Sequence, residues 1–355
     1  MLPAVARTEI RELEPGDLPD LVRFYASQTR ADHSERGDAV AHMHWYLYEN
    51  PARAPGIPAG FLGRDLEGRV AGALLCSPQR FRAGAAEHLV CISGGYYVDV
   101  AHRGLGLLLL RRLLGVKGYA HVSTTMNQAS GGIYERNGGY PITRTDRELL
   151  GVLRWPPLVE EVLLRRKLAP GLARAASKLA ALRPRAIRRG DRNRLRRVAS
   201  PDEIEADALV PLPELDGQLT AVRSPEFLRW RYFEGGDATR DLFVYRGERG
   251  RALVGAYRRW RGTTGQMRTL GVLDLWGALP VAETPALFEA LADWYAGEVD
   301  AIAVRGLLPE REAAARAAGF VSRDLPRATG VCIDPAGSLP TRDWYLVPAD
   351  GDSGH

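Results

Sequence analysis

The sequence predicts an α/β protein built from two copies of one fold, each copy a mixed central sheet flanked by helices. Strand-like and helix-like patterns alternate along the first part of the chain, which is typical of this class. A length of 355 residues favours two domains over one. Four short segments also recur later in the chain, in the same order and at similar spacing. Together these observations predict a tandem arrangement.

The elements of the first copy follow from local patterns. Residues 8–13 read as a strand, and Asp17 can cap a helix whose apolar positions recur at helical spacing. A second helix is expected over about 40–48, followed by strands over 61–64 and 69–76 and a further strand that leads to Val100. A glycine-rich turn then precedes three further elements: a helix over 106–114, a strand over 120–125 and a helix over 130–137.

The repeat is visible in four pairs of segments. Residues 44–50 correspond to 229–235, 70–74 to 253–257, 97–100 to 272–275, and 136–140 to 316–320. The second copy lacks the glycine-rich turn, because no Arg-x-x-Gly follows Asp274. Pro280 also removes one backbone N–H from this region. Only the first copy is therefore expected to bind a phosphorylated ligand through this turn.

Composition limits the classes of protein. No apolar run is long enough to span a bilayer, and the first twelve residues contain no signal-peptide core, so we expect a cytoplasmic protein with no membrane partner. Three widely spaced cysteines, Cys76, Cys91 and Cys332, read as reduced thiols rather than as a disulfide frame or a zinc site.

Charge is concentrated in one segment. Residues 165–197 hold thirteen Lys or Arg and one acid, whereas the whole chain carries a net charge of +5. This segment can be a solvated surface, can dock an acidic acyl carrier protein, or can attract nucleic acid. No aromatic residues are interleaved with its arginines, so the nucleic-acid interpretation is the least favoured.

The glycine-rich turn carries the clearest chemical signal. Residues 98–108 read Val-Asp-Val-Ala-His-Arg-Gly-Leu-Gly-Leu-Leu, a strand end, a turn and the start of a helix. Such a turn directs unpaired N–H groups and the positive end of a helix dipole at one point, which suits a phosphate or pyrophosphate. The pattern is neither a dinucleotide-binding G-x-G-x-x-G nor a P-loop.

Two motifs together resemble the GCN5-related N-acyltransferase (GNAT) superfamily. The first signature of that superfamily is matched by Val98, Arg103 and Gly106, and departs from it at Leu108, where a small residue is usual. The second is matched by the following residues: Asn127, Ser130, Tyr134, Glu135, Gly138 or Gly139, and Tyr140. The resemblance covers about residues 8–153 well and residues 221–332 weakly. It implies a catalytic GNAT domain over 1–158, a basic helical linker over 159–200, a GNAT-like domain without the cofactor motif over 201–345, and a tail over 346–355.

The resemblance implies that acetyl-CoA or another acyl-CoA is the co-substrate, and no metal is expected. Its pyrophosphate would lie on the N–H groups of residues 103–108, and its pantetheine arm would follow residues 98–100 like an added strand. The expected cofactor-binding residues are Val98, Val100, Arg103, Gly104, Leu105, Gly106, Leu107, Leu108 and Asn127. Asn127 can alternatively cap the helix that follows it.

The same resemblance implies direct attack of an amine on the thioester, with Tyr134 protonating the leaving thiolate. Asp99 is a candidate general base, although an Asp before such a turn is also common in this fold. An ordered water can serve instead, so the base stays open. His42 and His44 lie two apart on a helix, hence on different faces, which argues against metal chelation.

The acceptor is poorly defined by the sequence. An acidic stretch with Asp32, His33, Glu35 and Asp38 would suit a cationic amine, or is simply solvated. We expect an N-acyltransferase that acts on a primary amine of a small molecule. The alternatives are a carrier-protein-dependent acyltransferase and a non-catalytic acyl-CoA sensor or scaffold.

Overall fold

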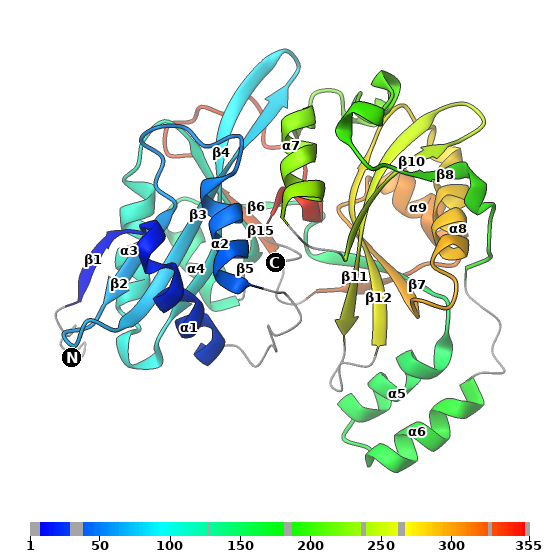
Figure 1. Cartoon of the computed structure of the whole chain (residues 1–355), viewed down its shortest axis with the longest axis horizontal. Helices are drawn as coiled ribbons and strands as arrows, with labels where there is room; N and C mark the ends of the chain where they lie inside the picture. The colour runs from blue at the N-terminus through cyan, green and yellow to red at the C-terminus, as the bar shows by residue number, and fades with distance from the viewer. Residues whose placement is uncertain are drawn as a thin grey trace.

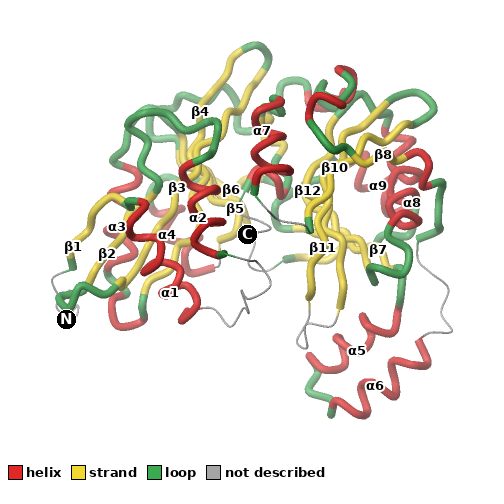
Figure 2. Tube along the Cα trace, in the orientation of Figure 1, coloured by secondary structure: helices red, strands yellow, loops and turns green. Residues whose placement is uncertain are grey.

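The computed structural model contains two mixed β-sheets side by side, each with helices on its faces (Figure 1). It describes residues 8–28, 38–126, 128–180, 187–235, 239–261, 267–325 and 329–351. Figure 2 shows that helices surround both sheets, with loops joining the layers at their ends.

The first sheet has the strand order β1-β2-β3-β4-β5-β15-β6. Along this order pairing is antiparallel except between β4 and β5, which run parallel. Two short strands, β9 (Leu219–Ala221) and β16 (Trp344–Tyr345), extend this sheet from β3. The main strands are β1 (Glu9–Glu12), β2 (Gly60–Arg64), β3 (Val70–Ala83), β4 (Ala86–Val98), β5 (Ala120–Met126), β6 (Tyr140–Ile142) and β15 (Thr329–Ile333).

Helices cover both faces of the first sheet. On one face lie α1 (Leu18–Gln28) and α2 (Ala39–Tyr48), and on the other α3 (Leu105–Leu114) and α4 (Gln128–Arg136). Each helix forms where apolar residues recur every three or four positions, so one stripe faces the sheet. In α3 the buried residues of that stripe include Leu105, Leu109, Leu110 and Leu113.

The second sheet repeats the same arrangement with the order β8-β10-β11-β12-β13-β7-β14. Its one parallel pair, β12 with β13, occupies the position of β4 with β5. Its strands are β7 (Arg147–Val152), β8 (Leu195–Arg197), β10 (Arg240–Arg246), β11 (Arg251–Arg261), β12 (Met267–Trp276), β13 (Ala301–Arg305) and β14 (Val321–Asp324). Its helices include α7 (Pro225–Arg229), α8 (Thr284–Trp294) and α9 (Pro309–Ala317). The predicted duplication of a mixed α/β fold is confirmed.

The repeated motifs meet at the boundary between the two copies. Trp45 of α2 and Trp230, which follows α7, occupy equivalent positions in the repeat. Their rings stack with centroids 5.0 Å apart, and Trp230 Nε1 donates to the carbonyl of Trp45 at 3.3 Å. Both side chains are buried in one cluster that joins the two copies. The sequence repeat therefore marks a pseudo-symmetric contact as well as a repeated fold.

The two sheets exchange one strand each. β7 lies in the N-terminal part of the chain but pairs with β13 and β14 of the second sheet. β15 lies in the C-terminal part but inserts between β5 and β6 of the first sheet. A cut at residue 158 or 201 consequently separates segments of the chain without separating the sheets.

A buried carboxylate holds the exchanged strand β7 in place. Glu148 is fully buried and accepts from Arg305 Nε of β13 at 3.0 Å and from Arg323 Nε of β14 at 2.7 Å. Arg259 of β11 approaches the same carboxylate to 3.6 Å. Three cations thus surround one acid carried by the exchanged strand, which fixes its register by charge as well as by pairing.

The described residues of the segments expected as linker and tail form helices, a strand and buried contacts. Helix α5 (Trp155–Arg165) runs into the expected linker, which also contains α6 (Pro170–Leu179) and the edge strand β8. Within residues 346–351 of the expected tail, the side chains of Leu346, Val347, Ala349 and Asp350 are buried. No helix in the described part of the chain is long and apolar enough to cross a membrane.

The prediction of three reduced cysteines is wrong. Cys76 of β3 and Cys91 of β4 form a disulfide, and Cys332 is free and buried. The register places Cys76 opposite Ser93 and Cys91 opposite Pro78, so the two cysteines are diagonal neighbours on adjacent strands. Their sequence separation gave no indication of this register.

Replacing Glu148 tests how β7 is held. Glu148→Gln should lower the free energy of unfolding by about 3–5 kcal/mol, because three arginines lose their shared buried partner. Urea unfolding followed by circular dichroism measures the change. Glu310→Gln, at an exposed position on α9, is the matched control and should change stability by less than about 0.5 kcal/mol. Equal stability of the two variants would contradict the assigned role.

Candidate active site

A fork between two parallel strands is the central feature of the first sheet. β4 and β5 pair from Val90 opposite Ala120 to Ser93 opposite Ser123. Beyond this point both strands continue, β4 to Val98 and β5 to Met126, without pairing with each other. The β5-facing edge of β4 between Gly94 and Val98 thus offers backbone N–H and C=O groups to a ligand.

A bulge in β4 opens the fork. Tyr97 lies opposite Ala73 and Gly94 opposite Leu75, so Gly95 and Tyr96 together face one residue of β3. Gly95 has φ +54°, and a Cβ there would lie 2.6 Å from the hydroxyl of Tyr25 on α1. Tyr25 donates that hydroxyl to the carbonyl of Gly95. Glycine is required at this position for both its conformation and its lack of a side chain.

Tyr134 lies at the vertex of the fork. Its side chain is buried, and its hydroxyl is 2.9 Å from Oγ of Ser93, the last β4 residue paired with β5. Ser93 donates its own hydroxyl to the carbonyl of Val122 at 3.2 Å. Since the Ser93 hydrogen is used there, Tyr134 donates to Ser93. A buried phenol anchored to Ser93 therefore stands where the two strands separate.

The turn at the other end of the exposed β4 edge begins with a capping interaction. The Ala101 N–H donates to Oδ1 of Asp99 at 2.8 Å, and the His102 N–H donates to the Asp99 carbonyl at 2.9 Å. Residues Val100–His102 form a single 3-10 turn, so the strand ends at Val98. Val100, expected to extend the strand, is instead mostly exposed in the turn, because the Asp99 cap bends the chain away from the sheet.

Helix α3 follows with Gly104 as its N-cap residue. Leu105 packs its side chain onto β2 and β3, where a Cβ at Gly63 or Gly72 would lie within 3.0 Å of it. A Cβ at Gly106 would lie 2.7 Å from the Tyr96 hydroxyl. These close contacts set the helix N-terminus directly against the end of β4. In its first turn the Gly106 N–H donates to the Arg103 carbonyl at 3.4 Å, and the N–H groups before it have no partner within the helix.

The other residues expected to bind a cofactor lie on the outer side of this helix turn. Arg103, Leu107 and Leu108 are exposed, and Arg103 forms no ion pair with any described residue. Leu108 thus occupies the solvent side of the first turn rather than the core. Asn127 lies outside the described residues.

The structure does not bring the two expected catalytic residues together. Asp99 follows Val98 at one end of the free β4 edge, and Tyr134 meets Ser93 at the other. Ser93 and Val98 are five positions apart along β4, about 16 Å at about 3.3 Å per residue. Asp99 therefore caps the turn and does not lie beside Tyr134.

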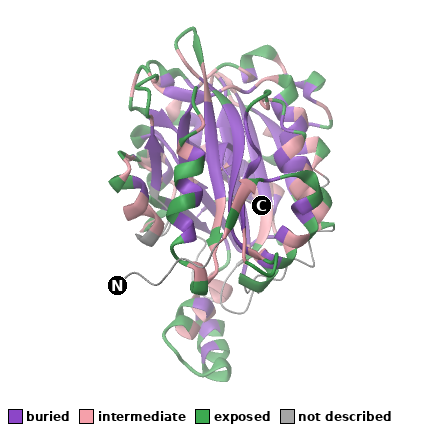
Figure 3. Cartoon of the chain, turned by 90° about the vertical axis from the view of Figure 1, so that its left-hand side faces the viewer, coloured by how far each residue is buried: buried purple, intermediate pink, exposed green. Residues whose placement is uncertain are grey.

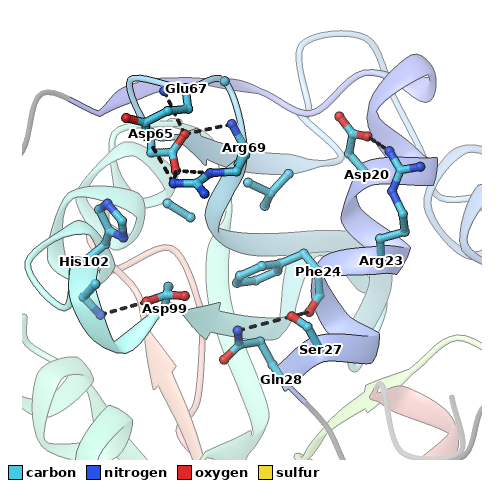
Figure 4. Close-up of a pocket in the computed structure, with 14 residues that line it drawn as sticks. Asp20, Arg23, Phe24, Ser27, Gln28, Asp65, Glu67, Arg69, Asp99 and His102 are labelled. Carbon is cyan, nitrogen blue, oxygen red and sulfur yellow. Dashed lines mark hydrogen bonds and ion pairs between the residues drawn. The ribbon is translucent and has the colours of Figure 1, made fainter.

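Asp99 also borders a hollow of about 560 Å³ between the turn, α1 and the β2–β3 connection (Figure 4). Four carboxylates line it, from Asp20, Asp65, Glu67 and Asp99. Arg64 and Arg23 pair with Asp20, and Arg69 pairs with Asp65 and Glu67. Hydrogen bonds from Arg64 and then Arg23 hold the pKa of Asp20 below its usual value. Asp99 is the lining carboxylate without an arginine partner among the described residues.

The acidic stretch expected near the acceptor is only partly described. Asp32, His33 and Glu35 lie outside the described residues. Asp38 is the N-cap of α2, where its carboxylate accepts from the N–H groups of Val40 and Ala41. Its observed role is structural.

Ser93 and Tyr25 are the site residues that sequence reasoning missed. The available signal was the Gly94-Gly95 pair inside a strand, which marks a bulge or a close backbone approach. That signal locates the bulge but not its partners, because Tyr25 and Tyr134 come from helices on opposite faces of the sheet.

The sequence matches no protein-family model and no curated protein sequence. Solved structures are similar in fold at low identity. Yeast (Saccharomyces cerevisiae) N-myristoyltransferase with bound myristoyl-CoA is 10% identical, with a TM-score of 0.58 over 93% of this chain and 79% of that one. A candidate acetyltransferase from Pyrococcus horikoshii is 13% identical, with a TM-score of 0.54 over 96% and 94%. A GCN5-related N-acetyltransferase from Kribbella flavida is 14% identical, with a TM-score of 0.51 over 94% and 72%.

The fold is that of the GNAT acyltransferases. The resemblance to this superfamily is thereby confirmed for the fold, and the high coverage of the Pyrococcus protein extends the likeness over both sheets.

The second GNAT-like sheet has the same fork, and a C-terminal segment of the chain contacts it. β12 pairs with β13 up to Val272 opposite Val304 and continues to Trp276. Tyr345 donates its hydroxyl to the Leu275 carbonyl at 3.0 Å, and the Leu346 carbonyl lies against Gly306, just after β13. The segment around Tyr345 and Leu346 therefore lies beside the part of β12 that continues beyond its pairing with β13.

The carboxylate of the second fork is also paired with an arginine of the same chain. Asp274 stands at the repeat position of Asp99, is fully buried, and accepts two hydrogen bonds from Arg223 at 2.5 and 3.1 Å. Arg223 also pairs with Asp350 at 2.5 Å. The second fork therefore holds a buried ion pair where the first has an exposed turn.

Two substitutions test the capping role of Asp99. One removes the acceptor oxygen, and the other removes only the charge. Asp99→Ala should lower the free energy of unfolding by about 1 kcal/mol and speed amide hydrogen exchange at Ala101, because the cap is lost. Asp99→Asn keeps an acceptor oxygen and should leave both within error of the parent protein. Equal exchange rates at Ala101 in all three proteins would contradict the capping role.

Proposed function

We propose that this protein is an acyl-CoA-dependent N-acyltransferase, with acetyl-CoA or another acyl-CoA as donor and a primary amine of a small molecule as acceptor. The observation that carries the proposal is the fork between β4 and β5. It places the Tyr134 hydroxyl at its vertex, a free strand edge along its side and the N-terminus of α3 at its mouth. The fold of the first sheet supports the same function.

Residues of the turn suit the anionic end of the donor. The N–H groups at the start of α3 and the helix dipole favour a pyrophosphate. Arg103 is exposed and available to pair with it. In this proposal Gly104, Leu105, Gly106, Leu107 and Leu108 contribute backbone N–H groups, while the side chains of Leu105 and Gly106 are committed to packing against the sheet.

The free edge of β4 suits the amide-containing arm of the donor. An extended chain with alternating N–H and C=O groups can pair with residues 94–98 as an added strand. Val98 marks the end of this edge near the turn, and Gly94 marks the end near Tyr134. The arm therefore leads from the phosphate seat to the vertex of the fork.

The chemistry at the vertex needs one acid and one hydrogen-bond donor. A neutral amine attacks the thioester carbon, a C–N bond forms and the C–S bond breaks. Tyr134 gives its phenolic proton to the leaving thiolate, and the excess proton of the amine leaves to solvent, which restores the phenol. A backbone N–H of the β4 bulge is positioned to stabilise the oxyanion that develops on the carbonyl. Ser93 anchors the Tyr134 hydroxyl at the vertex in the free protein, and this hydrogen bond breaks when Tyr134 gives its proton to the sulfur.

The acceptor approaches from the α1 side of the sheet in this proposal. The hollow beside α1 carries more carboxylates than arginines in its lining. An excess of negative charge favours a cationic amine in solution. Asp99, which has no arginine partner there among the described residues, adds to this field without touching the reacting atoms.

Tyr134→Phe tests the acid. Turnover should fall about 100-fold or more, because the thiolate leaves unprotonated, while the KM for acetyl-CoA stays within about twofold. Thiol release from acetyl-CoA, measured across a panel of primary amines, reports turnover. Ser93→Ala should lower turnover less and displace the basic limb of the pH profile, since it removes only the partner that orients the phenol.

Two variants serve as controls for this test. Tyr119→Phe removes another buried hydroxyl, one with no partner among the described residues, and should leave turnover unchanged. Asp99→Asn should also keep its turnover if Asp99 acts only in the turn. A Tyr134→Phe enzyme as fast as the parent with every amine would contradict the assignment of the acid.

A further inference from the structure

The helical hairpin formed by α5 and α6 stands apart from both sheets. Figures 1 and 3 show it extending below the second sheet, with most of its outer surface exposed. It joins the body mainly through the start of α5, where Trp155 and Leu158 pack on a small cluster of the second sheet. The two helices otherwise pack against each other, with Ala173 and Ser177 of α6 buried.

The outer surface of this hairpin is unusually apolar for an exposed element. Leu172 is 62% and Leu179 is 73% exposed, and seven residues separate them, so they lie on one face of α6. Val162 of α5 and Leu168 of the connecting turn are exposed as well. Four large apolar side chains thus face solvent on an element of about 25 residues, which marks an interaction surface.

Basic residues surround these side chains. Residues 165–180 contain five Lys or Arg and no acid. Arg165 and Arg174 pair with Glu161 and Glu160 of α5. Arg166, Lys167 and Lys178 are exposed and form no ion pair with any described residue. The hairpin therefore combines protruding leucines with uncompensated positive charge.

An exposed tryptophan lies at the end of the second sheet from which the hairpin extends. Trp260 is 55% exposed and stands opposite Arg268, at the end of the β11–β12 pair. β12 contacts α5 directly. Tryptophan is enriched where protein meets the headgroup region of a bilayer, because its ring is apolar while its N–H is polar.

We propose that the α5–α6 hairpin, together with Trp260, docks this protein on an anionic lipid surface. Lys and Arg side chains are attracted to anionic headgroups, and exposed leucines gain by burial at the acyl boundary. A nucleic acid would use the charge but leave Leu172 and Leu179 in water. The expectation of no membrane partner rested on the absence of a spanning segment, whereas this contact lies on the surface. The inference does not rest on the proposed acyltransferase function.

Vesicle sedimentation of the full-length protein tests the proposal. Vesicles of equal parts phosphatidylglycerol and phosphatidylcholine should sediment the protein at low salt, and pure phosphatidylcholine vesicles should not. The double variant Lys167→Glu/Lys178→Glu should weaken the partition constant at least tenfold, since each Lys near such a surface contributes about a fivefold preference. Leu172→Asp should weaken it independently of salt.

Two control variants distinguish a local contact of the hairpin with lipid from a general effect of net charge or exposed apolar surface. Lys117→Glu changes the same kind of charge at an exposed turn after α3, and Leu66→Asp changes an exposed leucine between β2 and β3. Both should sediment like the parent. The emission of Trp260 should also shift to the blue on vesicle binding, and Trp260→Phe should remove that shift.

Three outcomes would overturn the proposal. The first is the absence of sedimentation with anionic vesicles. The second is an equal loss of binding in Lys117→Glu and in the hairpin variant. The third is binding of DNA or of an acidic carrier protein through the hairpin lysines with no binding to vesicles, which would assign the surface to that partner.

Discussion

The exchange of β7 and β15 is the constraint on which the rest of the molecule depends. In the first sheet the strand between β5 and β6 is β15, which comes from the C-terminal part of the chain. β15 pairs with β5 from His121 to Met126, on the edge opposite to β4. One wall of the fork is thus supported by residues about 200 positions away. The C-terminal half therefore helps to shape the candidate site.

The two sheets are similar, but equivalent residues in them have different surroundings. Asp99 and Asp274 are equivalent in the repeat, yet one caps an exposed turn and the other is buried against Arg223. In the second fork, Tyr345 donates to the Leu275 carbonyl of β12, and the Leu346 carbonyl lies against Gly306. Gln79 of β3 donates to Asp350 at 3.2 Å, which links the second fork back to the first sheet. The second copy serves as a structural partner of the first.

Much of this organisation was predictable from the sequence. The repeat located Trp45 and Trp230, and two motifs located the turn and Tyr134, because helix periodicity and turn chemistry are local signals. The strand exchange was not predictable. Residues 147–152 and 329–333 have ordinary strand patterns, which do not indicate the strands with which they pair. The Cys76–Cys91 disulfide and the Ser93–Tyr134 contact likewise depend on how strands and helices pack, which the sequence does not reveal. Asp99 was placed beside the reaction centre by sequence proximity to the turn, whereas the extended β4 edge carries it away from Tyr134.

The central claim is that the chain has one donor site, in the first fork, and none in the second. Isothermal titration calorimetry with acetyl-CoA tests it most directly. The account predicts a stoichiometry of one per chain, and loss of saturable binding in Arg103→Glu, which places a negative charge at the phosphate seat. A stoichiometry of two, or unchanged affinity in Arg103→Glu, would contradict it.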